Sequence, residues 1–293
     1  MAVTVNFQLT VDFRAARRTI RTDDRTLLKQ TDGDTVDVQQ PVRMVSVDTP
    51  EKSGYAGSPA LSQPKLDRCR ERLEAGLFPA IPDALAEYLA AKLTPDAAKR
   101  HIDAANQATD ELEAALAVRL ALPEDKRRKL AVMPTGAYLD ENARLLAYLA
   151  PWYTKTELPP KDDPRRETFN LQQVRTGWGA FFPIYPSLPG NDDMNRAIEA
   201  ARIAWETPFG ARAEFGEDLL LAYEYRACIK LAADPTDPDP EKLTEDAFRR
   251  HCVDLRDLTL RGRFDWSDVP GWARLWIWEE DLPQARVDLG LTG

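Results

Sequence analysis

The chain is poor in the residues from which metal cages, disulfide frameworks and histidine-based catalytic sites are built. Its 293 residues include 3 cysteines and 2 histidines. The cysteines are odd in number and show no C-x-x-C spacing, which indicates buried thiols rather than a zinc site or a disulfide framework. Neither His101 nor His251 has a recognisable catalytic setting, so a histidine triad has little support.

Long apolar runs are also absent. No stretch approaches the roughly 18 consecutive apolar residues of a membrane-spanning helix, so we expect no membrane partner. Residues 1–9 alternate as a strand does and lack the basic-then-apolar layout of a signal peptide. The sequence as written therefore predicts a cytoplasmic protein, or a secreted one if a leader has been removed.

Positive charge is in deficit. The chain has 39 Lys and Arg against 48 Asp and Glu, a net charge of −9. This balance argues against non-specific binding to a duplex, because neutralisation of phosphates by cations supplies most of that affinity. Short basic runs occur at 126–129 and 161–166, and a solvated face is the simpler interpretation of both.

The most informative stretch is 31–51. Valines alternate with polar residues at 36–38 and again at 45–47, the period-2 pattern of strands, and 39–41 forms the turn between them. By this alternation Arg43 shares a face with the valines at 45 and 47. A guanidinium on a buried face requires an anion.

Three motifs follow one another in this chain. The first comprises D-G-D-T at 32–35 and R-x-x-x-x-D-T-P-E at 43–51. The second is D-E-N-A-R-L-L-A-Y at 140–148, and the third is a short Asn-containing helix that ends in V-R-T-G-W, at 169–178. In this order they resemble the staphylococcal-nuclease-like (thermonuclease) family over residues 1–207, with one large insertion. Asn142 and Ala143 replace the family's usual Tyr-Gly.

The acidic residues of these motifs predict a metal site. Asp34 and Asp48 offer the hard oxygen ligands that suit Ca²⁺ or Mg²⁺. The resemblance implies that Thr49 adds its backbone carbonyl and that Asp32 lies just outside the ligand set. It also implies a Ca²⁺ requirement, with Mg²⁺ or another divalent cation as the alternative.

The remaining site residues predict phosphate chemistry. Arg43 and Arg144 carry planar, permanently charged forks that can bind a phosphate with two hydrogen bonds. Glu51 is the candidate general base or water-orienting group. The resemblance implies cleavage of the 5′ P–O bond to leave 3′-phosphates.

The expected fold is α+β: a five-stranded OB-type β-barrel with packed helices. Residues 1–210 would form this domain, with a helical insertion at about 76–128 that is either a packed hairpin or a lid. Residues 211–293 would form a helical, Trp-rich extension. Strands are expected at 3–13, 25–29, 129–133 and 144–149, and helices at 61–75, 169–177, 192–206, 217–233, 240–260 and within 266–278.

Two functions of different class remain open. The first is a metal-dependent endonuclease, a phosphodiesterase acting on single-stranded or denatured DNA, RNA or both. The second is a non-catalytic nuclease-like scaffold that binds nucleic acid, or a protein partner through the Trp-rich extension. Four tryptophans at 266–278 suit a core or docking role better than base stacking, because acidic residues follow them at 279–281.

Overall fold

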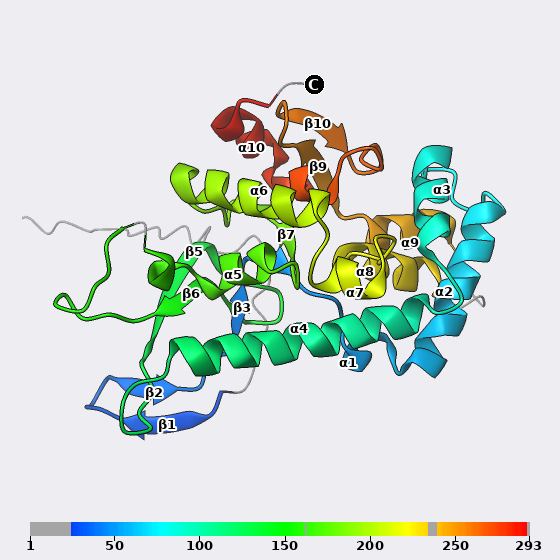
Figure 1. Cartoon of the computed structure of the whole chain (residues 1–293). Helices are drawn as coiled ribbons and strands as arrows, with labels where there is room; N and C mark the ends of the chain where they lie inside the picture. Colours follow the sequence, from blue (N-terminus) through cyan, green and yellow to red (C-terminus); the bar gives the residue numbers. More distant parts are fainter. Residues whose placement is uncertain (1–24, 162, 234–238, 292–293) are drawn as a thin grey trace, which may run out of the picture.

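The strands of the chain form several small sheets instead of one large one. The computed structural model in Figure 1 describes residues 25–161, 163–233 and 239–291. Within these residues the strands fall into four sheets, none closed into a barrel, so the α+β class is confirmed and the OB-type barrel is not. The strand expected at 3–13 lies outside the described residues. In chain order the strands are β1 (Leu27–Gln30), β2 (Val36–Val38), β3 (Val42–Met44), β4 (Ser46–Asp48), β5 (Leu130–Leu139), β6 (Leu145–Pro151), β7 (Ala180–Phe182), β8 (Ile184–Tyr185), β9 (Arg250–Asp254), β10 (Thr259–Gly262) and β11 (Arg274–Trp278).

Helices fill the predicted insertion at 76–128 and surround the sheets. The longest, α4, runs across the front of the molecule in Figure 1. Its buried face consists mainly of alanines, which let it approach α5 and α7 closely. No helix among the described residues is long and apolar enough to cross a membrane. The helices are α1 (Ser53–Ala56), α2 (Pro59–Glu74), α3 (Asp83–Lys92), α4 (Ala97–Arg119), α5 (Phe169–Arg175), α6 (Asn191–Glu206), α7 (Ala211–Phe215), α8 (Ala222–Leu231), α9 (Pro240–Ala247) and α10 (Leu282–Leu289), with single 3₁₀ turns at Pro164–Arg166, Gly271–Ala273 and Glu279–Asp281.

Residues 42–48 form one bent strand that two sheets share. β3 pairs in parallel with β6, and β4 pairs antiparallel with β7. The bend lies at Val45 and Ser46, where Ser46 has a φ of 58°. An irregularity of this kind interrupts the alternation, so side chains after it appear on the opposite face from the one that the pattern predicts.

This change of face corrects the expected position of Arg43. Met44, and not Arg43, packs in the same apolar cluster as Val47. Arg43 instead reaches Asp48, and its side chain is 31% exposed. The prediction that Arg43 shares the buried face of Val47 is therefore wrong, because the bend between them interrupts the period-2 alternation.

Asn170, in the first turn of α5, joins the bent strand to β6. Its Nδ2 donates to the carbonyl oxygens of Val45 at 2.8 Å and Ala147 at 3.2 Å, and its Oδ1 accepts from the amide of Leu149 at 3.0 Å. The side chain is 2% exposed. It supplies a partner for the carbonyl of Val45 and for the amide of Leu149, and it shares the carbonyl of Ala147 with the amide of Val45.

The C-terminal residues form a sheet as well as helices. β9, β10 and β11 join β8 in one sheet, and the helix predicted at 240–260 ends at Ala247. The helix predicted within 266–278 is strand β11 for its last five residues. Residues Arg274 to Ile277 are all buried, and apolar spacing does not distinguish a fully buried strand from a helix. The extension predicted to be helical therefore contains strands β9, β10 and β11 as well as helices.

The largest core cluster crosses the predicted domain boundary at residue 210. Phe182 stacks on Tyr223 with ring centroids 5.0 Å apart, and Tyr223 meets Trp276 edge-on at 4.8 Å. Trp266 is fully buried in the same cluster, and β8 pairs with β11. The segments on either side of residue 210 therefore share one core, in which these two tryptophans are enclosed.

Candidate functional site

Asp48, the last residue of β4, lies at the centre of a buried ionic cluster. Arg226 of α8 donates from Nη2 to Oδ2 at 2.7 Å and from Nη1 to Oδ1 at 3.2 Å, and Arg43 donates to Oδ1 at 3.3 Å. Burial acts to raise the pKa of Asp48, but Arg226 and Arg43 outweigh it and hold the pKa below its usual value. The carboxylate is thus ionised. Together with Glu51, we call these residues the Asp48 cluster.

Glu51 enters the cluster from the loop after β4. Its Oε1 accepts a 2.6 Å hydrogen bond from Nη1 of Arg226, and its backbone amide donates to Nε2 of His101 at 2.8 Å. Because Nε2 of His101 accepts, the ring proton lies on Nδ1, which donates to the carbonyl of Leu220 at 3.2 Å. Burial lowers the pKa of His101 to about 3, so the ring is neutral. A neutral histidine therefore holds the backbone of Glu51 in position.

Arg144 lies directly before β6, the strand that pairs with the strand of Arg43. The register places Arg43 opposite Leu146, and Arg144 precedes Leu146 by two residues. Asp140 holds the Arg144 guanidinium, with Nε and Nη2 at 2.8 Å and 2.7 Å from Oδ2. The two predicted phosphate-binding arginines thus come from neighbouring segments, and each is engaged by a carboxylate.

Asp32 and Asp34 lie in the turn of the β1–β2 hairpin. Asp34 accepts from the hydroxyl of Thr35 at 3.2 Å, its amide donates to Asp32 at 3.2 Å, and all three residues are exposed. In Figure 1 the hairpin projects at the lower left, well apart from α8, which contributes to the Asp48 cluster. The structure does not bring Asp34 to Asp48.

Thr49 follows Asp48 directly and is half-buried. Its methyl group lies beside the backbone of Gly179, where an added Cβ would be 3.4 Å from it and 2.4 Å from a methyl of Val47. A side chain at Gly179 would therefore displace the end of β4. The glycine lets the family-like motif at 48–51 pack closely on the segment after α5.

The predicted calcium ligands are not arranged as a metal-coordination site. Among the described residues there is no group of three or more His, Cys, Asp or Glu that could hold a metal ion. Both oxygens of Asp48 already accept from arginines, and Asp34 is on the distant hairpin. We therefore assign no chemical step to a metal.

Arg226 and Arg250 are site residues that the sequence analysis missed. Arg226 pairs with both Asp48 and Glu51, and electrostatic interaction with Arg250 also contributes to the low pKa of Asp48. Both come from the segment expected to be a separate extension. One sequence signal was available for Arg226: it stands in an otherwise largely apolar helical run, 219–231, where a guanidinium requires a partner.

A second buried network fixes the opposite side of α8. Glu224 is fully buried and accepts from Lys92 at 2.7 Å, from Tyr88 at 2.7 Å and from Arg274 at 3.0 Å. Burial acts to raise the pKa of Glu224, but Lys92 and Arg274 lower it to about 2. Between them, the Glu224 network and the Asp48 cluster determine how α8 is oriented.

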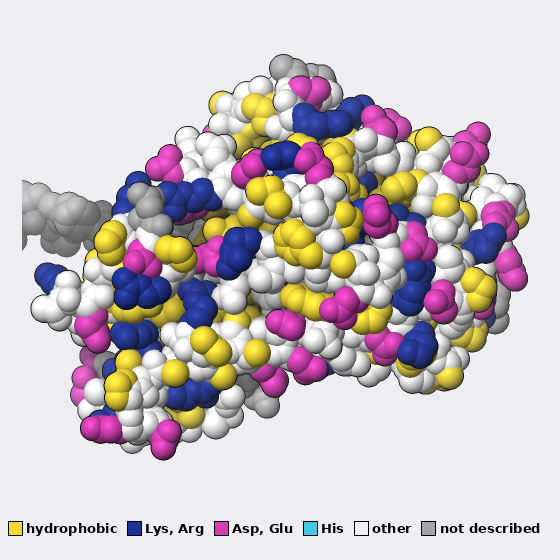
Figure 2. Space-filling model, in the orientation of Figure 1, with side chains coloured by type: hydrophobic (Ala, Val, Ile, Leu, Met, Phe, Trp, Pro, Cys, Tyr) yellow, Lys and Arg dark blue, Asp and Glu magenta, His cyan; other side chains and the backbone are white. Residues whose placement is uncertain are grey.

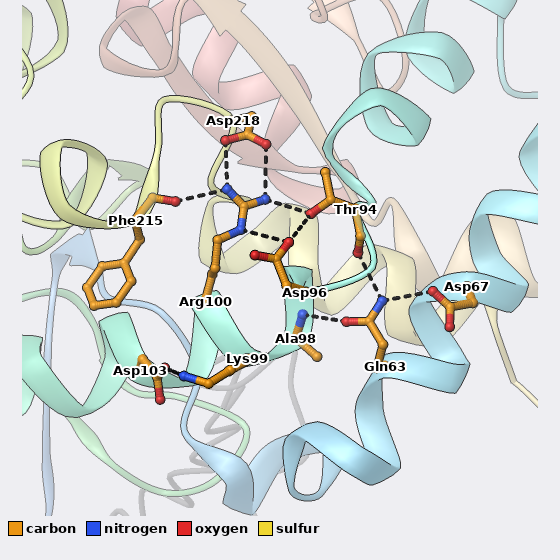
Figure 3. A network of polar contacts seen from close by, with 10 residues as sticks. All are labelled: Gln63, Asp67, Thr94, Asp96, Ala98, Lys99, Arg100, Asp103, Phe215 and Asp218. Atoms are coloured by element: carbon orange, nitrogen blue, oxygen red, sulfur yellow. Dashed lines mark hydrogen bonds and ion pairs between the residues drawn. The ribbon is translucent and has the colours of Figure 1, made fainter.

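Figure 3 shows a third network, which anchors the segment leading into α8. Arg100 of α4 donates to both carboxylate oxygens of Asp218 at 2.7 Å and 3.0 Å and to the carbonyl of Phe215 at 2.9 Å. Gln63 of α2 accepts from the amide of Ala98 and donates to the carbonyl of Thr94. Helix α4 of the insertion, itself bonded to α2, therefore supports the segment that leads into α8, the helix that completes the Asp48 cluster.

The basic side chains on the molecular surface are mixed with acidic ones. Figure 2 shows Lys and Arg gathered over β5, β6 and the loop after them, with Asp and Glu among them. Arg128 pairs with Glu157 at 3.4 Å and Arg165 with Asp163 at 2.7 Å. These contacts favour the interpretation of the basic runs as solvated faces.

Comparison of the chain with models of known protein families, with curated proteins and with solved structures finds no match.

Proposed function

We propose that the chain is a thermonuclease-type endonuclease that hydrolyses the phosphodiester backbone of nucleic acid beside the Asp48 cluster. One observation carries this proposal: the three family-like stretches 43–51, 140–148 and 169–178 pack together through the bent strand, β6 and α5. They lie far apart in the sequence. Their convergence is what a shared site requires.

The chemistry proposed for each side chain follows from its position. Arg43 and Arg144 are 31% and 36% exposed, so their guanidinium groups can reach a phosphate from solvent. Donors aimed at the phosphoryl oxygens would stabilise the charge that develops there during hydrolysis. Glu51 would accept a proton from the attacking water, and the hydrogen bond from its amide to His101 would hold it in place.

Single-stranded or denatured nucleic acid is the preferred substrate in this proposal. Asp48 itself is 5% exposed, at the inner end of the site. A single strand can bend to present one phosphate to recessed groups, whereas a duplex holds its phosphates on a stiff rod. The net charge of −9 likewise disfavours a duplex-binding surface.

A Ca²⁺ requirement stays a prediction. It rests on the resemblance alone, because both oxygens of Asp48 accept hydrogen bonds from arginines and Asp34 lies in the β1–β2 turn. Mg²⁺ or another divalent cation is the alternative. An OB-type barrel is likewise proposed: a bent strand shared by two sheets is the device by which a sheet turns the corner of a barrel.

The second candidate is a nuclease-like scaffold that binds nucleic acid, or a protein partner through residues 211–293, without cleaving it. The observation that favours it is the bidentate pairing of Asp48 with Arg226. That pairing occupies the carboxylate that a catalytic metal would need.

Circular single-stranded DNA separates the two candidates, because it has no ends and only an endonuclease opens it. We expect cleavage when Ca²⁺ is added, no cleavage in excess chelator, and a 10²- to 10³-fold slower rate for Arg144→Ala at an unchanged melting temperature. Arg202→Ala is the matched control, since Arg202 on α6 pairs only with surface glutamates among the described contacts. Binding without cleavage under any divalent cation would favour the scaffold.

A further inference from the structure

The guanidinium of Arg250, at the start of β9, is a cation without a counter-charge of its own. Its carbon Cζ lies 4.5 Å from the ring centroid of Trp278 and 5.2 Å from that of Phe182. Its Nε is buried and has no hydrogen-bond partner, and within the described residues the side chain forms no ion pair. Aromatic rings hold the group in place but do not neutralise it.

Other cations surround Arg250. Burial lowers the pKa of Arg250 to about 9, and Arg226 and Arg43 add to this shift while Asp48 opposes it. Lys230 is affected in the same way: burial lowers its pKa first, followed by Arg249 and Arg250, while Asp246 opposes the shift without forming an ion pair among the described contacts. Lys230 donates its described hydrogen bond to a backbone carbonyl, that of Asp246.

The acidic groups nearby do not balance these cations. Asp48 is shared between Arg226 and Arg43, and Glu51 is bound to Arg226. Arg249 has a distant partner, Glu141, at 3.7 Å. Lys230 and Arg250 are left without a carboxylate among the described contacts. Burying a cation without a partner is costly, and a methionine would fill the space between the two rings at lower cost.

We propose that Arg250 and Lys230, beside Arg226, form a binding subsite for a phosphate group. A phosphate bound here would accept hydrogen bonds from the guanidinium of Arg250 and the ammonium of Lys230. The planar fork of Arg250 suits two oxygens of a tetrahedral phosphate. Arg249, with a 52% exposed side chain, would extend the subsite to solvent. This inference rests on the proposed function, and the phosphate is then one in the bound nucleic-acid strand, next to the phosphate at Arg43.

The test is phosphate binding by the full chain in the presence of chelator, so that no divalent metal contributes. Inorganic phosphate is the probe. Its binding is measured by calorimetry and by the change in melting temperature. We expect phosphate to raise the melting temperature of the wild type. Arg250→Met and Lys230→Met should each weaken phosphate binding at least tenfold. Without phosphate, Arg250→Met should melt at the wild-type temperature or above it, because an unpaired and partly buried charge has been removed.

Arg250→Lys and Arg202→Met complete the test. Arg250→Lys keeps the charge and loses the fork, so it should fold and bind phosphate more weakly. Arg202→Met should bind phosphate as the wild type does. The inference is overturned if phosphate does not raise the melting temperature of the wild type. It is also overturned if Arg250→Met binds phosphate as tightly as the wild type does.

The proposed function is judged by a separate readout. Cleavage of circular DNA by a wild type that binds no phosphate would refute the subsite and leave the nuclease proposal standing. Arg250-dependent phosphate binding by a chain that neither binds nor cleaves denatured DNA would support the anion site and refute the nuclease.

Discussion

At the scale of single residues, the arginines around Asp48 first of all compensate its buried charge, whatever part they play in catalysis. Its carboxylate is 5% exposed and would be costly to bury alone. Arg226 supplies two hydrogen bonds and Arg43 one, and burial acts against the charged form that these bonds favour. Any substitution in the cluster therefore tests stability and activity together.

Arg226→Met is expected to destabilise the fold by about 3–5 kcal/mol, the range for removing one partner of a buried ion pair. Asp48 would keep only the 3.3 Å contact with Arg43, and Glu51 would lose its partner. Urea denaturation of the variant against wild type measures the loss. Arg202→Met should change stability by less than about 0.5 kcal/mol. Equal effects of the two substitutions would contradict the buried pairing.

The neutral state of His101 predicts a pH dependence of stability. Its pKa in the folded chain is about 3, set first by burial, against about 6.5 when unfolded. Between these values the unfolded chain binds a proton that the folded chain does not. The contribution of His101 to the free energy of unfolding is therefore complete above pH 6.5. It falls by about 1.4 kcal/mol per pH unit as the pH drops from there towards 3.

Chemical denaturation at pH 7 and pH 5 tests this expectation. Both pH values lie above 4.5, the ordinary pKa of a glutamate. Below pH 4.5 the stability would also fall because of Glu224, whose pKa in the folded chain is about 2. In His101→Gln the amide oxygen can accept from the Glu51 backbone without titrating, so the loss between these two pH values should largely disappear. His251→Gln is the control and should retain it.

At the scale of elements, the bent strand 42–48 depends on a side chain from a different element. Asn170 of α5 bonds to one backbone group at the bend, the carbonyl of Val45, and to two on β6, the carbonyl of Ala147 and the amide of Leu149. A side chain from a helix thereby supplies hydrogen bonds that the neighbouring strands do not make to each other at the bend.

Asn170→Ala should lower the free energy of unfolding by about 1–3 kcal/mol, because buried backbone groups lose their partners. Thermal or urea unfolding measures the effect. Asn195→Ala on the exposed face of α6 is the matched control and should be near neutral. If Asn170→Ala unfolds at the wild-type midpoint, water or backbone movement must satisfy these groups.

At the scale of the whole molecule, residues 211–293 belong to the same core as the rest. β8 pairs with β11, Arg226 completes the Asp48 cluster, and Glu224 bonds to Lys92 of α3. The sequence had suggested a separate C-terminal extension instead.

A chain ending at Arg212 is accordingly expected to lose cooperative unfolding and to expose apolar surface. It would lack α8 and the buried rings of Trp266 and Trp276. Near-UV circular dichroism and binding of an apolar dye to the truncated chain would detect the change. A sharp two-state transition in the truncated chain would instead indicate an autonomous 1–212 unit.

The sequence alone determined the local features. Alternating valines predicted strands at 36–38 and 45–47, close to β2 and β4, and the insertion at about 76–128 was predicted to be helical, as α3 and α4 are. The scarcity of cysteine predicted buried free thiols, as Cys69, Cys228 and Cys252 are. These features depend on residues that are close together in the sequence, so the pattern of apolar and polar residues is enough to predict them.

Tertiary structure decided which side chains meet. The bend at Ser46 changed the face of Arg43, and a fully buried strand at β11 had the apolar spacing of a helix. Arg226 reaches Asp48 across 178 residues of sequence, and Arg250 approaches from a strand that the periodicity had assigned to a helix. Long-range pairing of charges depends on how elements pack, and side-chain spacing along the chain carries no information about it.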